Sequence, residues 1–372
     1  MQRIIPFITI LLLVALACNG GAAPTVPPTP QSSVFDLGRT TYGFFPSPPE
    51  VKLESIFETY KGIAEHGDFV LLQQNTAWED FVNGVDGESQ TRTDLINQVI
   101  LARQNNIDYI FVTDALNGLN RREFAGLPEG WEASFANPNV RMAYKNFALW
   151  IVRQFHPRYL GLASEINTYM DAFPDDSPNF ISLYNEIYTA VKAEAPETQI
   201  FVTFQWDDLN NMFPQPEEGN QQKFDTKWEQ IEAFEPNLDL WVISSYPYFV
   251  FSSGADIPTD YYTPLLLRTD KPVAVAEGGY TTQNVGNIIS SPQDQVEFVE
   301  AIHDQLGPRL AFWVNTLLSD FNLDSYADFM KQNGQDEEDV TTLGFFAFIG
   351  LQNFDGTPKP ALELWDSYRS GE

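Results

Sequence analysis

Short apolar runs alternate with amphipathic segments along most of this chain. The apolar runs predict strands buried on both faces, as in a parallel sheet; they cover residues 34–43, 68–73, 108–113, 159–164, 199–204, 238–244, 273–276 and 310–315. Segments with apolar residues at every third or fourth position predict the helices between them; these cover residues 50–66, 91–105, 139–155, 179–194, 225–234, 260–267, 292–306 and 360–368. Eight strand–helix alternations with connections of ordinary length predict an α/β protein, a single (β/α)₈ TIM barrel.

A doubly wound sheet is the alternative fold, but it usually has a glycine-rich turn after its first strand, and the sequence contains no G-x-G-x-x-G. No internal repeat or second domain is evident, so the barrel is expected to span residues 34–372. The longest irregular part, residues 318–342, is acidic and follows the eighth strand. We expect a long loop there, and such loops often form lids or substrate walls.

The N-terminus has the pattern of an export signal. Arg3 precedes an apolar stretch, residues 4–17, that is too short to span a bilayer comfortably. The stretch ends in Ala15-Leu16-Ala17-Cys18, and Cys18 is the only cysteine. One interpretation is an ordinary A-x-A cleavage site. The other is a resemblance to the lipobox of bacterial lipoproteins, which implies residues 1–18 as signal peptide and acylation of Cys18.

Residues 19–33 are rich in Pro, Gly, Ser and Thr and predict a flexible linker. With the export signal, they predict an extracytoplasmic protein. It would be either anchored in the membrane through a lipid on Cys18, as a lipoprotein at the cell surface, or secreted.

The net charge of the chain argues against two classes of binding partner. The chain has 21 Lys+Arg against 51 Asp+Glu, a net charge of −30, which disfavours nucleic acid and adhesion to anionic lipid. The three histidines are far apart in sequence and no P-loop is present, so we expect neither a metal nor a cofactor. We also expect a monomer.

Residues just past each strand end share one rim of a barrel, where active sites of this fold lie. That rim combines amides, carboxylates and aromatic rings, a mixture that suits sugars. Trp206 and Trp313 stand at strand ends and are predicted sugar platforms, although core packing is the alternative for any tryptophan. The predicted rim is Arg39, Gln73, Asn75, Asp114, Ser164, Glu165, Asn167, Gln205, Trp206, Asp207, Tyr246, Glu277, Trp313 and Asn315.

Two of these carboxylates suit glycoside hydrolysis. Glu165 follows the fourth strand and Glu277 the seventh. One carboxyl must be protonated to donate to the leaving oxygen, and the other ionised to attack the anomeric carbon. A separation of about 5 Å between the two carboxyl groups gives retention of the anomeric configuration, and roughly 6.5–9.5 Å gives inversion. Because the fourth and seventh strands lie near each other across the barrel mouth, we expect the shorter distance. The structural alternative is that Glu165 caps a helix and Glu277 pairs with Arg39.

Glu165, Glu277 and the tail GLQNFDGTPKPALELW at residues 350–365 resemble clan A of the retaining glycoside hydrolases. The resemblance implies that Glu165 is the acid/base and Glu277 the nucleophile. It also implies that Tyr246 hydrogen-bonds the nucleophile and that Trp313 stacks on a sugar. The segment ISSYPYF at residues 243–249 is similar to both family 53 endo-β-1,4-galactanases and family 17 β-1,3-glucanases.

Ser164 stands where the clan usually has an Asn that holds the sugar 2-hydroxyl, so a water or Asn167 would have to make that contact. The sequence thus predicts a retaining hydrolase of β-linked polysaccharide or oligosaccharide. Its predicted substrate-binding residues are Asn75, Asp114, Ser164, Asn167, Trp206, Tyr246 and Trp313. The change at Ser164 motivates the alternative of a non-catalytic carbohydrate-binding lipoprotein. A cell-surface scaffold whose rim contacts another protein is the third hypothesis.

Overall fold

The computed structural model describes residues 33–213, 223–332 and 337–371. The predicted signal peptide, Cys18 and all of the linker except Ser33 lie outside the described residues. Within the described residues, no helix combines the length and the apolar character needed to cross a membrane.

All strand pairings in the main sheet are parallel, and the strand order is β5-β4-β3-β2-β1-β9-β8-β7-β6. β5 pairs with β4 and β6 pairs with β7, so these two short strands are the halves of one barrel strand. The predicted (β/α)₈ barrel is confirmed. The strands are β1 (Thr41–Phe44), β2 (Phe69–Asn75), β3 (Asp108–Asp114), β4 (Tyr159–Gly161), β5 (Gln199–Phe201), β6 (Thr203–Gln205), β7 (Trp241–Ser245), β8 (Val273–Gly278) and β9 (Leu310–Asn315).

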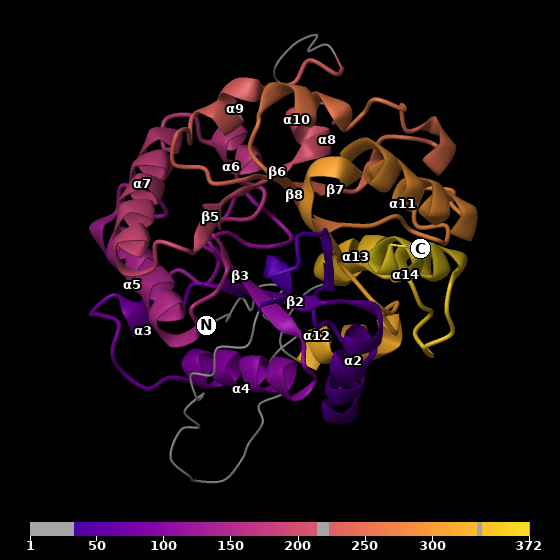
Figure 1. Cartoon of the computed structure of the whole chain (residues 1–372). Helices are drawn as coiled ribbons and strands as arrows, with labels where there is room; N and C mark the ends of the chain where they lie inside the picture. The colour runs from indigo at the N-terminus through magenta and orange to yellow at the C-terminus, as the bar shows by residue number, and fades with distance from the viewer. Residues whose placement is uncertain (1–32, 214–222, 333–336, 372) are drawn as a thin grey trace.

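The helices form a ring around the strands (Figure 1). The larger ones are α2 (Leu53–His66), α4 (Gln90–Gln104), α5 (Pro138–Phe155), α7 (Ser177–Glu194), α11 (Pro292–Leu306), α12 (Leu323–Gln332), α13 (Glu337–Phe346) and α14 (Pro360–Ser370). Shorter helices lie in the connections: α3 (Trp78–Phe81), α6 (Ile166–Ala172), α8 (Trp206–Leu209), α9 (Trp228–Glu232) and α10 (Thr263–Arg268).

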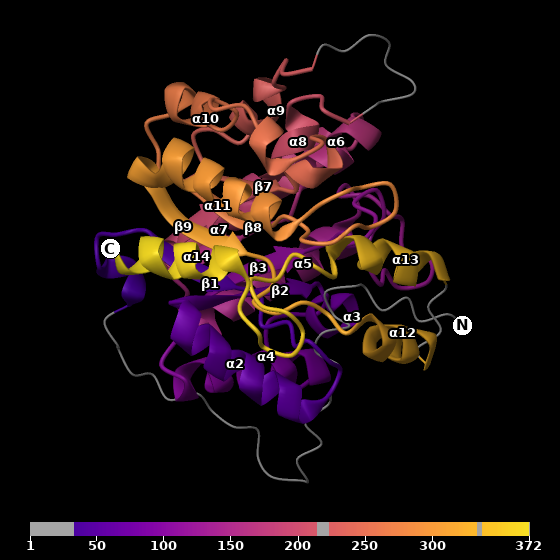
Figure 2. The ribbon, with the colours of Figure 1, turned by 90° about the vertical axis from the view of Figure 1, so that its right-hand side faces the viewer.

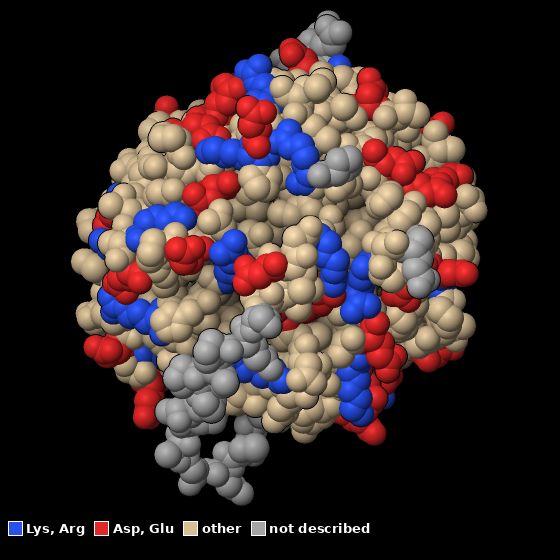
Figure 3. Space-filling model, in the orientation of Figure 1, with Lys and Arg blue, Asp and Glu red and all other residues tan. Residues whose placement is uncertain are grey.

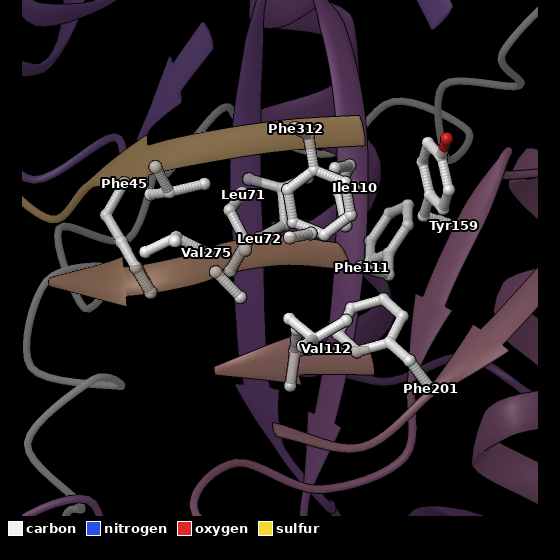
Figure 4. Close-up of a cluster of buried hydrophobic side chains, with 14 of the residues drawn as sticks. Phe45, Leu71, Leu72, Ile110, Phe111, Val112, Tyr159, Phe201, Val275 and Phe312 are labelled. Carbon is white, nitrogen blue, oxygen red and sulfur yellow. The ribbon is translucent and has the colours of Figure 1, made fainter. Parts of the chain in front are cut away.

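Aromatic rings fill the barrel interior, where Figure 4 shows Tyr159, Phe201 and Phe312 in the space that the strands enclose. The Phe312 ring lies 5.1 Å from the Tyr159 ring and 5.9 Å from the Phe201 ring, centroid to centroid. A glycine at two strand positions makes the room. A Cβ on Gly43 would lie 2.5 Å from the Phe69 ring, and one on Gly161 would lie 2.9 Å from the Phe201 ring. Cores are close-packed, so neither position tolerates even a methyl group without movement.

The first predicted strand, residues 34–43, is wrong in its first half. Residues Val34–Asp36 form a 3₁₀ turn, and Gly38 bends the chain with a left-handed φ of 71° before β1 begins. The Arg39 guanidinium donates to both carboxylate oxygens of Asp68 at 2.9 Å. Asp68 immediately precedes β2, so Arg39 lies at the N-terminal end of the barrel. It is neither a rim residue nor the partner of Glu277.

The acidic stretch after β9, predicted as a loop at residues 318–342, contains α12 and most of α13. Tyr326 and Met330 are buried on one side of α12, and the Tyr326 ring packs 4.4 Å from that of Phe321. Tyr326 and Met330 are four residues apart, so they lie on one face of α12, and this apolar face is buried although the segment is acidic. Figure 2 shows α12 and α13 together beyond one end of the barrel, where they cover part of its mouth.

The surface charges are mixed in sign. Figure 3 shows Lys and Arg interspersed with Asp and Glu over the face in view. Pairs such as Arg153 with Glu194 and Arg268 with Glu232 take up part of the positive charge. Each exposed pair contributes little to stability, about 0–1 kcal/mol.

Candidate active site

Glu165 lies at the start of α6, four residues after β4 ends, in the left-handed region with φ 50° and ψ 43°. Such a conformation costs a non-glycine residue on the order of 1–3 kcal/mol and persists only where the surroundings enforce it. Here the backbone N–H of Glu165 donates to Thr203 Oγ1 at 2.8 Å. Its side chain makes no helix-capping bond, so capping does not explain this carboxylate.

Glu277 lies within β8, next to an irregularity in the sheet. Ile243 of β7 pairs with Val275, but the next residue, Ser244, pairs with Glu277, so Ala276 is an extra residue in β8. Bulges of this kind bend a strand and re-aim the side chains beside them. The bulge therefore sets the position of Glu277 at the C-terminal end of the barrel.

Arg121 joins the two glutamates. Its Nε lies 3.2 Å from Glu165 Oε2, its Nη2 lies 4.0 Å from Glu277 Oε2, and its Nη1 donates to Asp114 Oδ2 at 2.5 Å. The Arg121 side chain is only 6% exposed, and both glutamate side chains are 13% exposed. Glu165 and Glu277 thus share one guanidinium at the barrel mouth, so the fold places them close together.

The buried charges set the titration of the site. Burial, and then the charge of Glu165, raises the pKa of Glu277 to about 7, whereas Arg121 and a hydrogen bond from Tyr246 lower it. Burial also raises the pKa of Asp114. Although burial opposes its charge, Asp114, Glu165 and Glu277 together raise the pKa of Arg121, so the guanidinium stays protonated. Three acids around one cation therefore favour retention of a proton on Glu277 near neutral pH.

Hydroxyl groups complete the surroundings of both glutamates. Tyr246 Oη donates to Glu277 Oε1 at 2.8 Å and lies 2.9 Å from Thr316 Oγ1. Ser244 Oγ donates to Glu165 Oε1 at 2.5 Å. Ser164 Oγ lies 3.4 Å from Glu277 Oε2, beside the candidate nucleophile. Tyr246 and Ser164 are therefore where the sequence analysis expected them.

Three predicted binding residues instead support the rim from below. Both amide hydrogens of Asn167 are used, on the Gln205 carbonyl and on Asp208, each at 3.1 Å. Asn75 donates to the Leu116 carbonyl at 2.8 Å. Asp114 is bound to Arg121, and all three predicted residues are buried. The structure does not bring Asn167 to the cleft as a substitute for the missing asparagine, because its amide is already committed.

Trp206 and Trp313 do not reach the cleft either. Their exposed fractions are 0% and 1%. Trp313 packs against Trp365 of α14 at 4.8 Å, and Trp206 donates its indole N–H to the Tyr261 carbonyl at 3.2 Å. Since successive side chains of a strand point to opposite faces, Trp313 faces the helix layer and not the mouth. Core packing, the alternative left open from the sequence, is what the structure shows for both.

Three residues of the site were missed from the sequence: Arg121, Ser244 and Thr316. Arg121 lies in the irregular connection between β3 and α5. The sequence of this connection has no periodic apolar pattern from which its position could be predicted. Its signal was the pair Arg121-Arg122 in a chain with few basic residues. Asp207, by contrast, was on the predicted rim and is fully buried, where it accepts hydrogen bonds from the Tyr246 backbone N–H and the Tyr261 hydroxyl at 3.0 and 2.6 Å. It holds the backbone of Tyr246 in place.

Two cavities flank the glutamates. The "Glu277 cavity", about 50 Å³, is lined by Glu277 together with Phe45, Ser47, Gly118, Leu119, Tyr246, Thr316, Leu317, Phe321 and Phe346. The "Glu165 cavity", about 390 Å³, is lined by Glu165 together with Gly118, Leu119, Asn120, Arg121, Arg122, Thr168, Phe249, Thr342, Phe345 and Phe346. A larger cavity, about 550 Å³, lies at the opposite end of the barrel around Phe35 and Asp108 and contains neither glutamate.

We expect Tyr246→Phe to lower kcat/KM about ten- to hundredfold, because a hydrogen bond to a charged group contributes about 1.5–3 kcal/mol. That bond lowers the pKa of Glu277, so its loss raises this pKa and moves the acid limb of the pH–rate profile to higher pH. The matched control is Tyr184→Phe, a buried tyrosine that donates to Asn237 far from the cleft. An unmoved limb in Tyr246→Phe would contradict the assignment.

Solved structures that are similar to this chain include glycoside hydrolases. The chain is similar to the exo-β-1,4-mannosidase Op5Man5 from Opitutaceae bacterium strain TAV5, with a TM-score of 0.62 and 12% identity over 90% of this chain and 60% of that one. The fold is a glycosidase-like barrel. It is also similar to a GH5_18 protein from Bifidobacterium longum subsp. longum in complex with Manβ1-4GlcNAc, with a TM-score of 0.62 and 12% identity over 89% of this chain and 78% of that one.

A third similar structure is the GH53 catalytic domain from Ignisphaera aggregans, with a TM-score of 0.54 and 16% identity over 89% of this chain and 92% of that one. No protein-family model and no curated protein sequence matches the chain. The chain spans only 60% of the mannosidase. These likenesses establish the fold alone, a glycosidase-like barrel.

Proposed function

We propose that this chain is a retaining glycoside hydrolase that acts on β-linked glycans, with Glu277 as nucleophile and Glu165 as acid/base. One observation carries the proposal: two carboxylates from β8 and the end of β4 share the Arg121 guanidinium, and one of them also accepts the Tyr246 hydroxyl. Two carboxyl groups that flank a scissile bond are the requirement for this chemistry.

The first step would form a covalent intermediate. A Glu277 oxygen attacks the anomeric carbon while the bond to the glycosidic oxygen breaks, and Glu165 gives its proton to that oxygen. In the second step a water attacks the anomeric carbon, Glu165 takes the water's proton, and the ester to Glu277 breaks. Two displacements restore the original configuration, so the product is a β-sugar.

Two neighbouring groups partly offset the rise in the pKa of Glu277. The Tyr246 hydroxyl and Arg121 both lower the pKa of Glu277 against the effect of its burial. Because that pKa is about 7, the ionised fraction of Glu277 rises with pH through neutrality. Activity is therefore expected to fall on the acid side of this range, where Glu277 becomes protonated.

A glycan-binding protein without hydrolysis is the second candidate. Two observations favour it: Ser164 replaces the usual asparagine, and Arg121 contacts both carboxylates where a substrate would have to enter. Lost contacts to the sugar 2-hydroxyl would remove transition-state stabilisation.

The test is a screen of β-mannan, β-1,4-galactan, β-1,3-glucan and xylan, with the released sugar followed by proton NMR. We expect release of reducing ends from one of them, with the β-anomer appearing before mutarotation. Glycan binding without any release would favour the second candidate, and an initial α-anomer would exclude the double displacement.

A further inference from the structure

The Arg121 guanidinium has hydrogens left over after its contacts with the acids. Its Nε donates to Glu165 Oε2 at 3.2 Å, and its Nη1 donates to Asp114 Oδ2 at 2.5 Å. Its Nη2 lies 4.0 Å from Glu277 Oε2, which is too far for a hydrogen bond. Among the described residues Nη2 has no acceptor, and Arg121 lines the Glu165 cavity. Nη2 is therefore able to donate to a ligand that enters the mouth.

The gap between Arg121 Nη2 and Glu277 Oε2 suits one hydroxyl group. Hydrogen bonds to a hydroxyl oxygen are about 2.7–3.0 Å long, so a single oxygen can reach both atoms across 4.0 Å. A hydroxyl can accept one hydrogen bond and donate another. Here it would accept from the guanidinium and donate to the carboxylate, and the charge on each partner strengthens such bonds.

Under the proposed function, the hydroxyl that reaches this gap is the one on C2 of the attacked sugar. C2 is bonded to the anomeric carbon, so its hydroxyl lies beside the attacking carboxylate. Glu277 Oε1 already accepts from the Tyr246 hydroxyl, which also lies 2.9 Å from Thr316 Oγ1. Glu277 Oε2 instead has the Nη2 donor of Arg121 beside it. Hydrogen bonds to the 2-hydroxyl strengthen in the transition state, so this contact would accelerate the reaction.

Two other polar side chains of the site are poorly placed for this contact. Both amide hydrogens of Asn167 are used below the rim. Ser164 Oγ donates to Glu277 Oε2 at 3.4 Å and accepts from Thr203 Oγ1 at 3.3 Å. A serine has a single hydrogen to donate, and that of Ser164 is directed at the nucleophile, so the guanidinium is the better donor to the sugar.

We infer that Arg121 holds the 2-hydroxyl of the attacked sugar, so the serine at position 164 does not have to make this contact. The inference rests on the proposed function and narrows its substrate class to β-glycosides whose attacked ring has a free hydroxyl at C2. A 2-deoxy ring leaves Nη2 without an acceptor. A 2-ammonium group has hydrogens to donate but no lone pair, and it would face the guanidinium with like charge. Both kinds of sugar are therefore expected to be poor substrates.

The test compares matched pairs of chromogenic substrates on each protein. The substrates are 4-nitrophenyl β-glycosides of 1,4-linked mannobiose, galactobiose and xylobiose and of 1,3-linked glucobiose. Each is made with and without the C2 hydroxyl on the ring that carries the nitrophenyl group. The readout is the ratio of kcat/KM for the hydroxy member to that for the deoxy member. Both members report on the same folded fraction of a variant, so partial unfolding does not change this ratio.

We expect the ratio to be at least about 100 in the wild type. Arg121→Lys should lower it at least about tenfold, since one ammonium cannot reach both acids and the sugar as the guanidinium does. Ser164→Ala should change it by less than about threefold. The matched control is Arg39→Lys, which alters the pair with Asp68 at the other end of the barrel and should keep the wild-type ratio.

The outcomes separate the inference from the function on which it rests. A ratio in Arg121→Lys within about threefold of the wild-type value would overturn the inference and leave hydrolysis intact. A fall of about tenfold or more in Ser164→Ala would do the same, because it would assign the 2-hydroxyl to the serine. This second variant decides the question even where Arg121→Lys does not fold. If the wild-type protein hydrolyses none of the hydroxy substrates, the proposed function fails and the inference fails with it.

Discussion

Replacement of Glu277 by Gln is expected to lower kcat at least about a thousandfold on any glycan that the wild-type protein hydrolyses, because a neutral amide cannot form the glycosyl ester. The substitution keeps the shape of the side chain and can still accept a hydrogen bond from Tyr246, so the fold is expected to persist. Initial rates measured with protein of matched thermal midpoint test this. The control is Glu58→Gln on α2, an exposed carboxylate paired with Lys61, which should retain full activity.

Glu277→Gly extends this prediction. The shorter residue leaves space beside the anomeric carbon, and added azide is expected to attack there in a single displacement and restore turnover as an α-glycosyl azide. The same addition to Glu165→Gly should restore activity only on substrates whose leaving group needs no proton. Full activity of Glu277→Gln, or azide rescue of neither variant, would remove Glu277 from the role of nucleophile.

The second large effect concerns stability. Arg121→Met is expected to lower the free energy of unfolding at pH 7 by about 3–5 kcal/mol, because loss of one partner leaves buried charge uncompensated. The wild-type guanidinium faces Asp114, Glu165 and Glu277 at a site only 6% exposed. The matched control is the adjacent Arg122→Met, an exposed side chain whose loss should change stability by less than about 0.5 kcal/mol. Urea unfolding of the three proteins measures both values.

The stability loss of Arg121→Met is expected to depend on pH. Without Arg121, the folded-state pKa of Glu277 rises further above its unfolded value, because Arg121 lowers it in the wild type. A raised folded-state pKa destabilises above the unfolded-state pKa, and the effect vanishes below it, where the carboxyl is protonated in both states. The deficit of Arg121→Met should therefore be largest at pH 7 and above and shrink toward pH 4. A deficit independent of pH would indicate lost packing instead of uncompensated charge.

Much of the barrel followed from local sequence. The predicted bounds of β9 and α11 match the structure, since a continuous apolar run and a proline at the first helical position define them; α11 also has the Ser291–Asp294 capping box. The prediction of the first strand was wrong because Phe35 is apolar for another reason. Its ring centroid lies 5.3 Å from that of Phe69, and the side chain closes the N-terminal end of the barrel. The apolar character of Phe35 alone did not distinguish a residue that closes the end of the barrel from a strand residue.

The site was predictable only where strand position determines it. Glu165, Tyr246 and Glu277 meet because C-terminal strand ends share one rim. Trp313 was placed on that rim by the same rule, but which face a strand residue presents depends on register, and it faces α14. Arg121 comes from an irregular connection whose path depends on tertiary contacts, so sequence periodicity contains no information about its position.

The most direct test of the central claim is to trap the covalent intermediate. A 2-deoxy-2-fluoro-β-glycosyl fluoride of the sugar found in the screen forms the ester quickly and releases it slowly, because the fluorine destabilises both oxocarbenium-like transition states and the fluoride is a good leaving group. Intact-protein mass spectrometry should show one fluoroglycosyl unit, and peptide mapping should place it on Glu277. Labelling of Glu165, or turnover of the probe to an inverted product without any adduct, would contradict the account.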